Sequence, residues 1–339
     1  MKVAILSSIA WRTPPRKYGP WEQVASSIAE GLLERGIDVT LFATGDSITK
    51  GKLESVCEHP YAEDNALDPK VWECLHISQL MEQADEFDII HNHFDFLPLT
   101  YSKLIKTPVI TTIHGFSSQQ IVPVYKKYNL TSSYVSISNA DRHQDLEYLR
   151  TIYNGIDPDN FTFREQKEDY LLYFGRIHPN KGTHAAIKIA RESGYQIKIA
   201  GLIQDENYFN KEIKSYIDND QVVYLGNAGP ALRNELLGGA RALLHPIYFD
   251  EPFGLSVVEA MMCGTPVIAF NRGSMPELIV DGVTGYLVND IADAVSAVNK
   301  LDHIEHQTCR EHASTNFSAE RMIDEYISAY KTVLQGVKV

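Results

Sequence analysis

Residues 241–260, RALLHPIYFDEPFGLSVVEA, contain the transition that decides the fold. The stretch begins with a short apolar run, continues through a loop that Pro252 and Gly254 make irregular, and ends in a second, longer apolar run. The first run is continuously apolar rather than alternating, which is typical of a strand buried on both faces of a parallel sheet. The stretch therefore predicts a strand, a loop and a helix, with Ser256 as the helix N-cap.

The same succession recurs on both sides of this stretch. The predicted helices are 22–35, 139–149, 182–193, 230–239 and 319–334. The predicted strands are 2–6, 38–43, 88–91, 108–113, 133–137, 170–174, 196–200, 221–225, 241–245 and 266–270. Strands that alternate with helices through both halves predict the α/β class, with two doubly wound, Rossmann-like domains.

A segment rich in Asn, Gly, Pro and charged residues, 154–169, separates the two halves. Such residues break regular structure and stay at the surface. We therefore expect an N-terminal domain at 1–160 and a C-terminal domain at 161–317. Ligands of open α/β sheets bind beyond the carboxyl ends of the strands, so the functional site is expected in a cleft between the two sheets.

The composition excludes several classes of protein. The chain has 339 residues, and 31 Lys and Arg against 44 Asp and Glu give a net charge of −13. This excess argues against binding to nucleic acid, and we expect membrane association to be weak or absent. The four cysteines are widely spaced and form no CxxC pair, so we expect neither a disulfide framework nor a zinc site. With no signal-peptide core and no long apolar run, we expect a cytoplasmic protein.

Charged residues gather after two predicted strands of the second half. Arg176 and Lys181 lie five residues apart, and a planar donor fork and a mobile point charge both suit a diphosphate. Glu251 lies on the loop of the opening stretch and Glu259 in the helix that follows, so they would meet different parts of one ligand. Free amides at the start of that helix would bind phosphate. Each pair taken alone is also compatible with ordinary surface charges, and for an isolated pair of glutamates this interpretation is the preferred one.

The first half offers weaker signals. Gly19 permits close backbone approach before the helix at 22–35. His114 follows the strand at 108–113 and is expected to face the cleft. His91 and His93 have a spacing that suits metal ligands, but no third ligand accompanies them, so we expect structural histidines. The Asp-x-Asp triplets, 157–159 and 218–220, are expected to form turns.

Taken together, these segments resemble the GT-B-fold glycosyltransferases of family four, which are retaining enzymes that use sugar nucleotides. The resemblance covers nearly the whole chain. Its strongest part is the E-x7-E stretch from Glu251 to Glu259, which continues to Ala269. The other matching segments are Asn154–Asp157, Gly175–Gly182, Gly273–Glu277 and Asp281–Val288.

The resemblance implies a role for each candidate residue. Arg176 and Lys181 would bind the donor diphosphate and stabilise the leaving nucleotide. Glu259 would accept hydrogen bonds from the donor ribose, and Glu251 would hold the donor sugar. The expected catalytic residues are Glu251, His114, Arg176 and Lys181. The expected donor-binding residues are Gly19, Arg176, Lys181, Glu251, Phe253, Gly254, Leu255, Ser256 and Glu259.

The N-terminal half is also given roles by the resemblance. His114 would line the pocket of the transferred sugar, and Gly19 would let the N-terminal loop close over phosphate. The family usually has two glycines where this chain has Gly19 and Pro20. Proline has no amide donor and a fixed φ, so the phosphate contact of the loop would rest on Gly19. The helix at 318–335 would cross back to the N-terminal domain.

The activity that the resemblance implies is transfer of a hexose from a UDP- or GDP-linked sugar to a hydroxyl of a sugar or small-molecule acceptor. No cofactor and no metal are expected, because Arg176, Lys181 and a helix N-terminus would stabilise the leaving diphosphate. The resemblance places Glu251 on sugar hydroxyls, which favours a front-face mechanism over a covalent one. The alternatives are a sugar-nucleotide epimerase or hydrolase on the same fold, or a non-catalytic sugar-nucleotide-binding subunit. The sequence does not indicate the oligomeric state.

Overall fold

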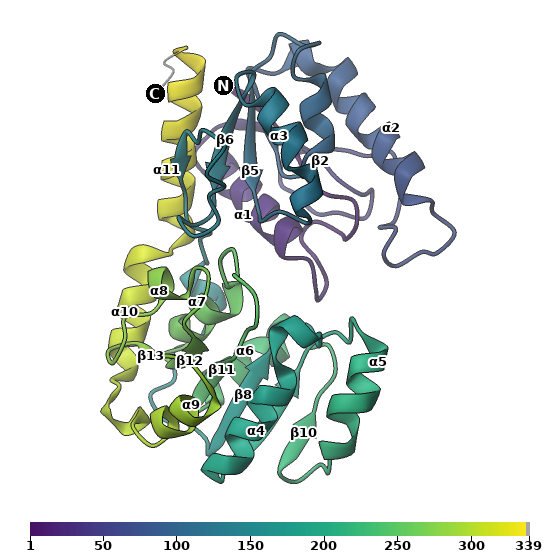
Figure 1. Cartoon of the computed structure of the whole chain (residues 1–339). Helices are drawn as coiled ribbons and strands as arrows, with labels where there is room; N and C mark the ends of the chain where they lie inside the picture. Colours follow the sequence, from purple (N-terminus) through teal and green to yellow (C-terminus); the bar gives the residue numbers. More distant parts are fainter. Residues whose placement is uncertain (337–339) are drawn as a thin grey trace. The chain divides into compact units, whose positions relative to one another are not determined.

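The computed structural model describes residues 1–336, which form two compact units (Figure 1). The first unit comprises Met1–Gly155 together with the C-terminal helix that begins at Ala319. The second comprises Ile156–Ser318. The sequence predicts that the first domain ends at residue 160. In the structure, the boundary between the two units lies five residues earlier, after Gly155.

The first unit is built on a parallel sheet. Its strands are β1 (Lys2–Leu6), β2 (Asp38–Phe42), β3 (Lys52–Glu54), β4 (Ile89–Asn92), β5 (Val109–Ile113), β6 (Ser132–Ser136) and β7 (Arg150–Thr151). They pair in the order β3-β2-β1-β4-β5-β6-β7. The chain therefore winds outward in both directions from β1 and β4, as in a doubly wound fold. The helices are α1 (Pro20–Glu34), α2 (Pro69–Glu82), α3 (Val122–Tyr128) and α11 (Ala319–Leu334).

The second unit repeats this plan. Its strands are β8 (Tyr170–Phe174), β9 (Gln196–Ala200), β10 (Val222–Tyr224), β11 (Ala242–His245), β12 (Val267–Phe270) and β13 (Gly285–Val288), all parallel, in the order β10-β9-β8-β11-β12-β13. Its helices are α4 (Thr183–Ser193), α5 (Glu206–Tyr208), α6 (Pro230–Gly239), α7 (Leu255–Met262), α8 (Met275–Leu278), α9 (Ile291–Val298) and α10 (His306–Asn316). The prediction of the α/β class with two Rossmann-like, parallel-sheet units is confirmed.

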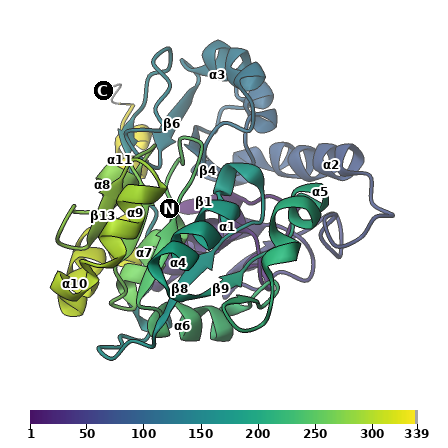
Figure 2. The same ribbon diagram turned by 60° about the horizontal axis from the view of Figure 1, so that its bottom comes forward.

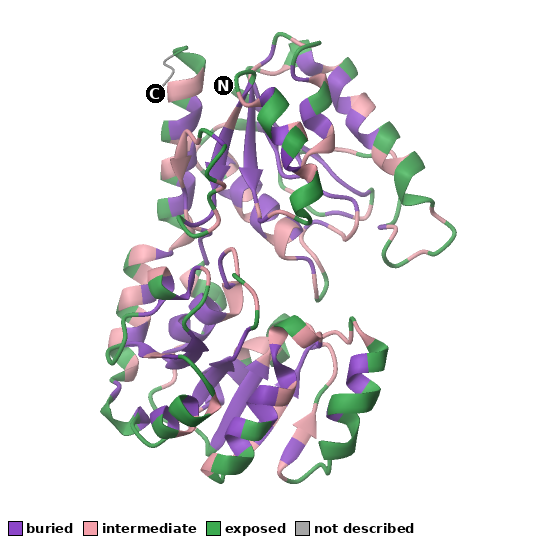
Figure 3. Ribbon diagram, in the orientation of Figure 1, coloured by how far each residue is buried: buried purple, intermediate pink, exposed green. Residues whose placement is uncertain are grey.

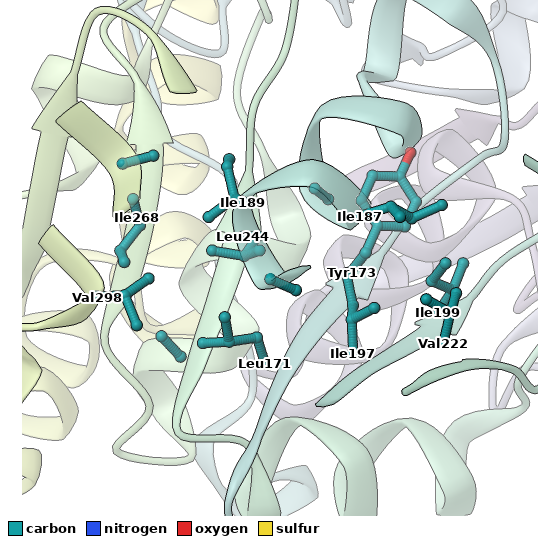
Figure 4. Close-up of a cluster of buried hydrophobic side chains, with 14 of the residues drawn as sticks. Leu171, Tyr173, Ile187, Ile189, Ile197, Ile199, Val222, Leu244, Ile268 and Val298 are labelled. Atoms are coloured by element: carbon teal, nitrogen blue, oxygen red, sulfur yellow. The ribbon is translucent and has the colours of Figure 1, made fainter. Parts of the chain in front are cut away.

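The apolar side chains of the strands form the core of each unit. In the second unit, Leu171, Ile197 and Ile199 of the sheet pack against Ile187 and Ile189 of α4 (Figure 4). The helix α4 contacts β8 and β9 and lies beside α9, an arrangement that the turned view also shows (Figure 2). The central strands are buried while the outer helical faces are exposed (Figure 3), which explains why the sequences of these strands are continuously apolar.

The predicted strands all exist, with ends displaced by no more than one residue. The sequence missed the short edge strands β3 and β7, and also β13. The predicted helix at 139–149 is wrong, because this segment forms turns. Side chains there bind backbone amides: the Ser138 hydroxyl accepts from the Asp141 amide, and the Tyr148 hydroxyl accepts from the His143 amide. Such local bonds compete with helix formation.

The last helix, α11, packs on α1 within the first unit. Gly31 of α1 allows the close approach, since a Cβ at this position would lie 1.9 Å from Cδ1 of Ile323. On another side of α11, the buried Tyr326 and Tyr330 reach the sheet through hydrogen bonds to Thr112 and His91, each 2.7 Å long. The resemblance places this helix on the N-terminal domain, and its apolar spacing supplies the buried face. No helix within residues 1–336 is both long and apolar enough to span a membrane.

We expect Ile323→Ala to destabilise the protein by about 2–5 kcal/mol, because the substitution leaves a cavity between α1 and α11. Ile327→Ala is the matched control, since Ile327 is on the same helix but partly exposed. Urea unfolding followed by circular dichroism measures both. Equal losses for the two variants would contradict the packing described here.

Candidate functional site

The loops that follow β8 and β11 meet at the carboxyl edge of the second sheet, because these strands are neighbours. Lys181 comes from the first loop and Glu251 from the second. The Lys181 ammonium donates to both carboxylate oxygens of Glu251, at 2.7 Å to Oε1, and each side chain is only 13% exposed. The structure thus joins two residues that the sequence assigned separately to the diphosphate and the sugar.

The surroundings of Glu251 keep its carboxylate charged. Burial by itself raises the pKa of this group, but the charge of Lys181 and the neighbouring His245 more than offset burial and lower the pKa to about 2. His245 ends β11, and its Nε2 lies 3.6 Å from Oε2 of Glu251. The ring of Phe249 lies 4.9 Å from the Lys181 ammonium and shields the pair on one side.

Glycines of the matching segments allow these loops to touch. Gly182 has φ 71°, and a Cβ there would lie 1.9 Å from the carbonyl oxygen of Pro246. Gly273 has φ 53°, and its Cβ would lie 2.3 Å from the amide nitrogen of Glu251. The amide of Ser274 then donates to the Glu251 carbonyl at 3.0 Å, and its hydroxyl donates to the Phe253 carbonyl. These positions require glycine, so the segment around Gly273 acts as a support for the Glu251 loop.

The helix α7 begins directly after this loop. The prediction that Ser256 is its N-cap is wrong: Gly254, with φ 108°, is the N-cap, and Ser256 is the second helical residue. Glycine is favoured there because φ is positive and because a Cβ would lie 2.8 Å from Cε of Met275. The first backbone bond of the helix runs from the Val257 amide to the Gly254 carbonyl, at 3.0 Å. The amides of Leu255 and Ser256 come before this bond, at the N-terminus of α7, which is the end of a helix where anions bind.

Arg176 has a different partner from Lys181. Its guanidinium donates to the side-chain oxygen of Gln204, on the loop after β9, and its carbonyl accepts from the Tyr173 hydroxyl at 2.7 Å. The sequence singled out Arg176 but gave no signal for Gln204. Their contact connects the loops after β8 and β9, two neighbouring strands of the sheet.

Glu259 is buried on α7 and pairs with Arg233 of α6, whose Nη1 lies 3.1 Å from Oε1. Burial raises the pKa of Glu259, and the charge of Arg233 acts in the opposite direction. Sequence reasoning missed Arg233, because a single arginine on a polar helix carries no signal of its partner. The pair orients the carboxylate that the resemblance assigns to the donor ribose.

In the first unit, Gly19 is the N-cap of α1 with φ 151°, and Pro20 is the first helical residue. Proline is well tolerated there, since the amide it lacks has no partner within the helix. Nearby, Glu22 is buried, and burial raises the pKa of its carboxyl to about 7, against hydrogen bonds from its own amide, Ser8 and the backbone of Trp11. Compared with the family pattern, Pro20 therefore removes one amide at the start of α1.

His114 follows β5, and its Nε2 lies 2.9 Å from Nδ1 of His93. The Trp21 ring stacks on His114, with ring centroids 5.6 Å apart. The histidine at 91 is structural, because its nitrogens bond to the hydroxyls of Tyr330 and Thr112 at 2.7 and 2.8 Å. Within residues 1–336, no group of three or more His, Cys, Asp or Glu side chains could hold a metal ion.

Both Asp-x-Asp triplets form turns. Asp157 accepts from the amide of Asp159 at 3.0 Å and caps a short 3-10 turn. Asp218 accepts from the amides of Asp220 and Val222 at 3.0 and 2.9 Å, just before β10. The carboxylates of Asp157 and Asp218 accept hydrogen bonds from nearby backbone amides, as the turn interpretation predicts.

Two family models match the chain in succession. Glycosyltransferase Family 4 matches residues 22–160, and Glycosyl transferases group 1 matches residues 158–321. The chain belongs to glycosyltransferase family 4. It is therefore an enzyme of the glycosyltransferase class, and its two parallel-sheet units are the two halves of the GT-B fold.

Relatives of this glycosyltransferase support the assignment. An uncharacterised 41.2 kDa protein in the cps region of Klebsiella pneumoniae is 31% identical, over 73% of this chain and 80% of that protein. The D-inositol 3-phosphate glycosyltransferase of Mycolicibacterium smegmatis is 30% identical over 60% of this chain and 51% of its own.

Solved structures share the fold. AviGT4, a glycosyltransferase involved in avilamycin A biosynthesis, has a TM-score of 0.74 and 24% identity over 99% of both chains. HepE of Anabaena, solved in complex with UDP and glucose, has a TM-score of 0.74 and 20% identity over 98% of this chain and 100% of its own.

We expect Lys181→Met to cost about 3–5 kcal/mol above pH 5, because it leaves the buried Glu251 carboxylate without its counter-charge. The folded-state pKa of Glu251 is about 2, below its ordinary 4.5, so the stability it contributes is present above pH 4.5 and lost as pH falls toward 2. The cost of Lys181→Met should therefore shrink over this range. Unfolding free energies measured by urea titration from pH 3 to pH 7 test this.

The double variant Lys181→Met/Glu251→Gln is the control. It removes both charges and should recover much of the stability that the single variant loses at neutral pH. A single and a double variant of equal stability at every pH would show that the ion pair is not responsible.

Proposed function

We propose that this glycosyltransferase is a retaining enzyme that transfers a hexose from a UDP- or GDP-linked sugar to a hydroxyl of a sugar or small-molecule acceptor. The observation that carries the proposal is the buried Lys181–Glu251 pair. Glu251 lies three residues before Gly254, the N-cap of α7. A cation, a carboxylate and a helix N-terminus on adjacent loops suit a sugar joined to a diphosphate. HepE, of the same fold, has been solved with UDP and with UDP-glucose.

The diphosphate would be held by local positive charge in a chain whose net charge is −13. Lys181 and Arg176 would neutralise the charge that develops on the leaving nucleotide, together with the amides of Leu255 and Ser256. These groups supply the stabilisation without a metal ion or other cofactor, so we propose that neither is required. The carboxylates of Glu251 and Glu259 would accept hydrogen bonds from the sugar and ribose hydroxyls.

The state of Glu251 supports a front-face mechanism. Both of its oxygens accept from Lys181, and a carboxyl with a pKa of about 2 is a weak nucleophile and a weak base. In the proposed step the bond from the anomeric carbon to the phosphate oxygen breaks, and the acceptor oxygen bonds to the same face of that carbon. The acceptor proton passes to the departing phosphate oxygen. Configuration is then retained without a covalent intermediate.

The first experiment is a thermal-shift screen with UDP, GDP, ADP and dTDP sugars, since a bound donor raises the melting temperature. The donor that shifts it is then incubated with acceptors, and proton NMR reads the anomeric configuration of the product. Activity should persist in EDTA. An inverted product, or a sugar adduct trapped on Glu251, would overturn the mechanism.

The same assay separates the other activities. Free hexose released without acceptor would indicate a hydrolase, and a changed sugar on the nucleotide would indicate an epimerase. Binding without turnover under any condition would indicate a non-catalytic subunit.

We expect Arg176→Ala and Lys181→Ala each to lower kcat by about 10²-fold or more, the usual cost of removing one group that stabilises charge in the transition state. Lys188→Ala is the control, because Lys188 is an exposed cation on the neighbouring α4; its kcat should stay within about twofold. Initial rates measure the effect, and thermal unfolding verifies the fold. Arg176→Ala is the stricter test, because it leaves the Lys181–Glu251 pair intact.

A further inference from the structure

Three histidine rings form a chain at the carboxyl ends of β4 and β5 in the first unit. The ring centroids of His91 and His93 lie 4.0 Å apart, and those of His93 and His114 lie 5.1 Å apart. His91 and His93 are fully buried, whereas His114 is partly exposed. Since Nδ1 of His93 and Nε2 of His114 are 2.9 Å apart, one of them donates and the other accepts.

All three rings are neutral at physiological pH. Burial lowers the pKa of His114 to about 3. Burial also takes the pKa values of His91 and His93 well below the ordinary value, and the neighbouring rings add to this. A neutral imidazole has one N–H and one lone pair, so the bond between His93 and His114 allows two arrangements. In one, His93 donates from Nδ1; in the other, His114 donates from Nε2.

The second nitrogen of His93 distinguishes the two arrangements. Its Nε2 is buried and has no hydrogen-bond partner within residues 1–336. The adjacent His91 is not a hydrogen-bond partner of this nitrogen, because both ring nitrogens of His91 are bonded to the hydroxyls of Tyr330 and Thr112. If His114 donated, His93 would carry its proton on Nε2, as a buried N–H without an acceptor. Orphaned N–H groups of this kind are rarer than unpaired acceptors, so the proton belongs on Nδ1.

We infer that His93 is a positioning residue, whose Nδ1–H donates to Nε2 of His114 and holds His114 in the tautomer that presents its own Nδ1–H to a hydroxyl of a sugar at the carboxyl edge of the first sheet. The bond to His93 uses Nε2 of His114, and within the described part of the chain the other ring nitrogen, Nδ1, has no hydrogen-bond partner. Trp21 stacks on the ring at an interplanar angle of 21° and restrains its rotation. The sugar contact rests on the proposed function, whereas the tautomer rests on the histidine geometry alone.

The tautomer is tested directly by NMR of protein labelled with ¹⁵N-histidine. Two-bond proton–nitrogen correlations separate protonated from bare ring nitrogens, and His93→Asn and His114→Asn assign the signals. We expect the His114 signal to show a protonated Nδ1 and a bare Nε2. A proton on Nε2 of His114, or an average of both tautomers, would overturn the inference.

The role in catalysis is tested with two variants of His93. An asparagine places an amide N–H near the position of Nδ1, whereas a leucine removes the donor at similar volume. We expect His93→Leu to lower kcat/KM for the sugar nucleotide by about tenfold, while His93→Asn stays within about twofold. The Kd of the nucleoside diphosphate alone should not change in either variant, because it lacks the sugar.

Equal losses in the two variants, or weaker binding of the nucleoside diphosphate, would show that His93 acts only through the fold and would overturn its positioning role. Thermal unfolding of both variants identifies a folding defect, and the asparagine variant keeps the test valid if the leucine variant does not fold. If the unchanged enzyme transfers sugar from no nucleotide sugar, the proposed function fails. The NMR spectrum then decides the tautomer independently.

Discussion

The ion pair of Lys181 and Glu251 is the interaction on which the candidate site of the second unit depends. It joins the loops after β8 and β11 at the edge where ligands of parallel sheets bind. Burial by itself raises the pKa of Glu251, and the charge of Lys181 together with His245 more than offsets this effect. The pair therefore links the two loops through a buried contact between their side chains.

The backbone around the pair is shaped to permit this contact. Gly182, Gly254 and Gly273 all have positive φ, and a Cβ at any of them would collide with a neighbouring segment. Ser274 then closes the arrangement by donating to the carbonyls of Glu251 and Phe253. The conformational freedom of glycine, rather than the charges themselves, thus decides how closely the loops approach.

The first unit uses neutral hydrogen bonds for the same purpose. The hydroxyls of Tyr326 and Tyr330 tie α11 to Thr112 and His91 of the sheet. His91 in turn packs against His93, which bonds to His114 at the end of β5. A helix from the C-terminal end of the chain therefore supports the residue that the resemblance places in the sugar pocket. In both units, the residue expected to meet the ligand is held by a buried partner.

The sequence by itself determined the family and all the strands except the edge strands β3, β7 and β13. Continuous apolar runs identify strands buried on both faces, and motif residues such as Glu251 and Glu259 keep their spacing whatever surrounds them. The helix expected at 139–149 is wrong, because side chains such as Tyr148 bond to the local backbone amides and favour turns. The N-cap expected at Ser256 is wrong, because the positive φ of Gly254 places the start of the helix there.

Only the tertiary structure decided the partners. Arg233, Gln204 and His93 contact Glu259, Arg176 and His114 from other elements, and no spacing along the chain encodes those contacts. The pKa values of the site were likewise decided by the fold, because they depend on burial and on charges brought together from distant segments.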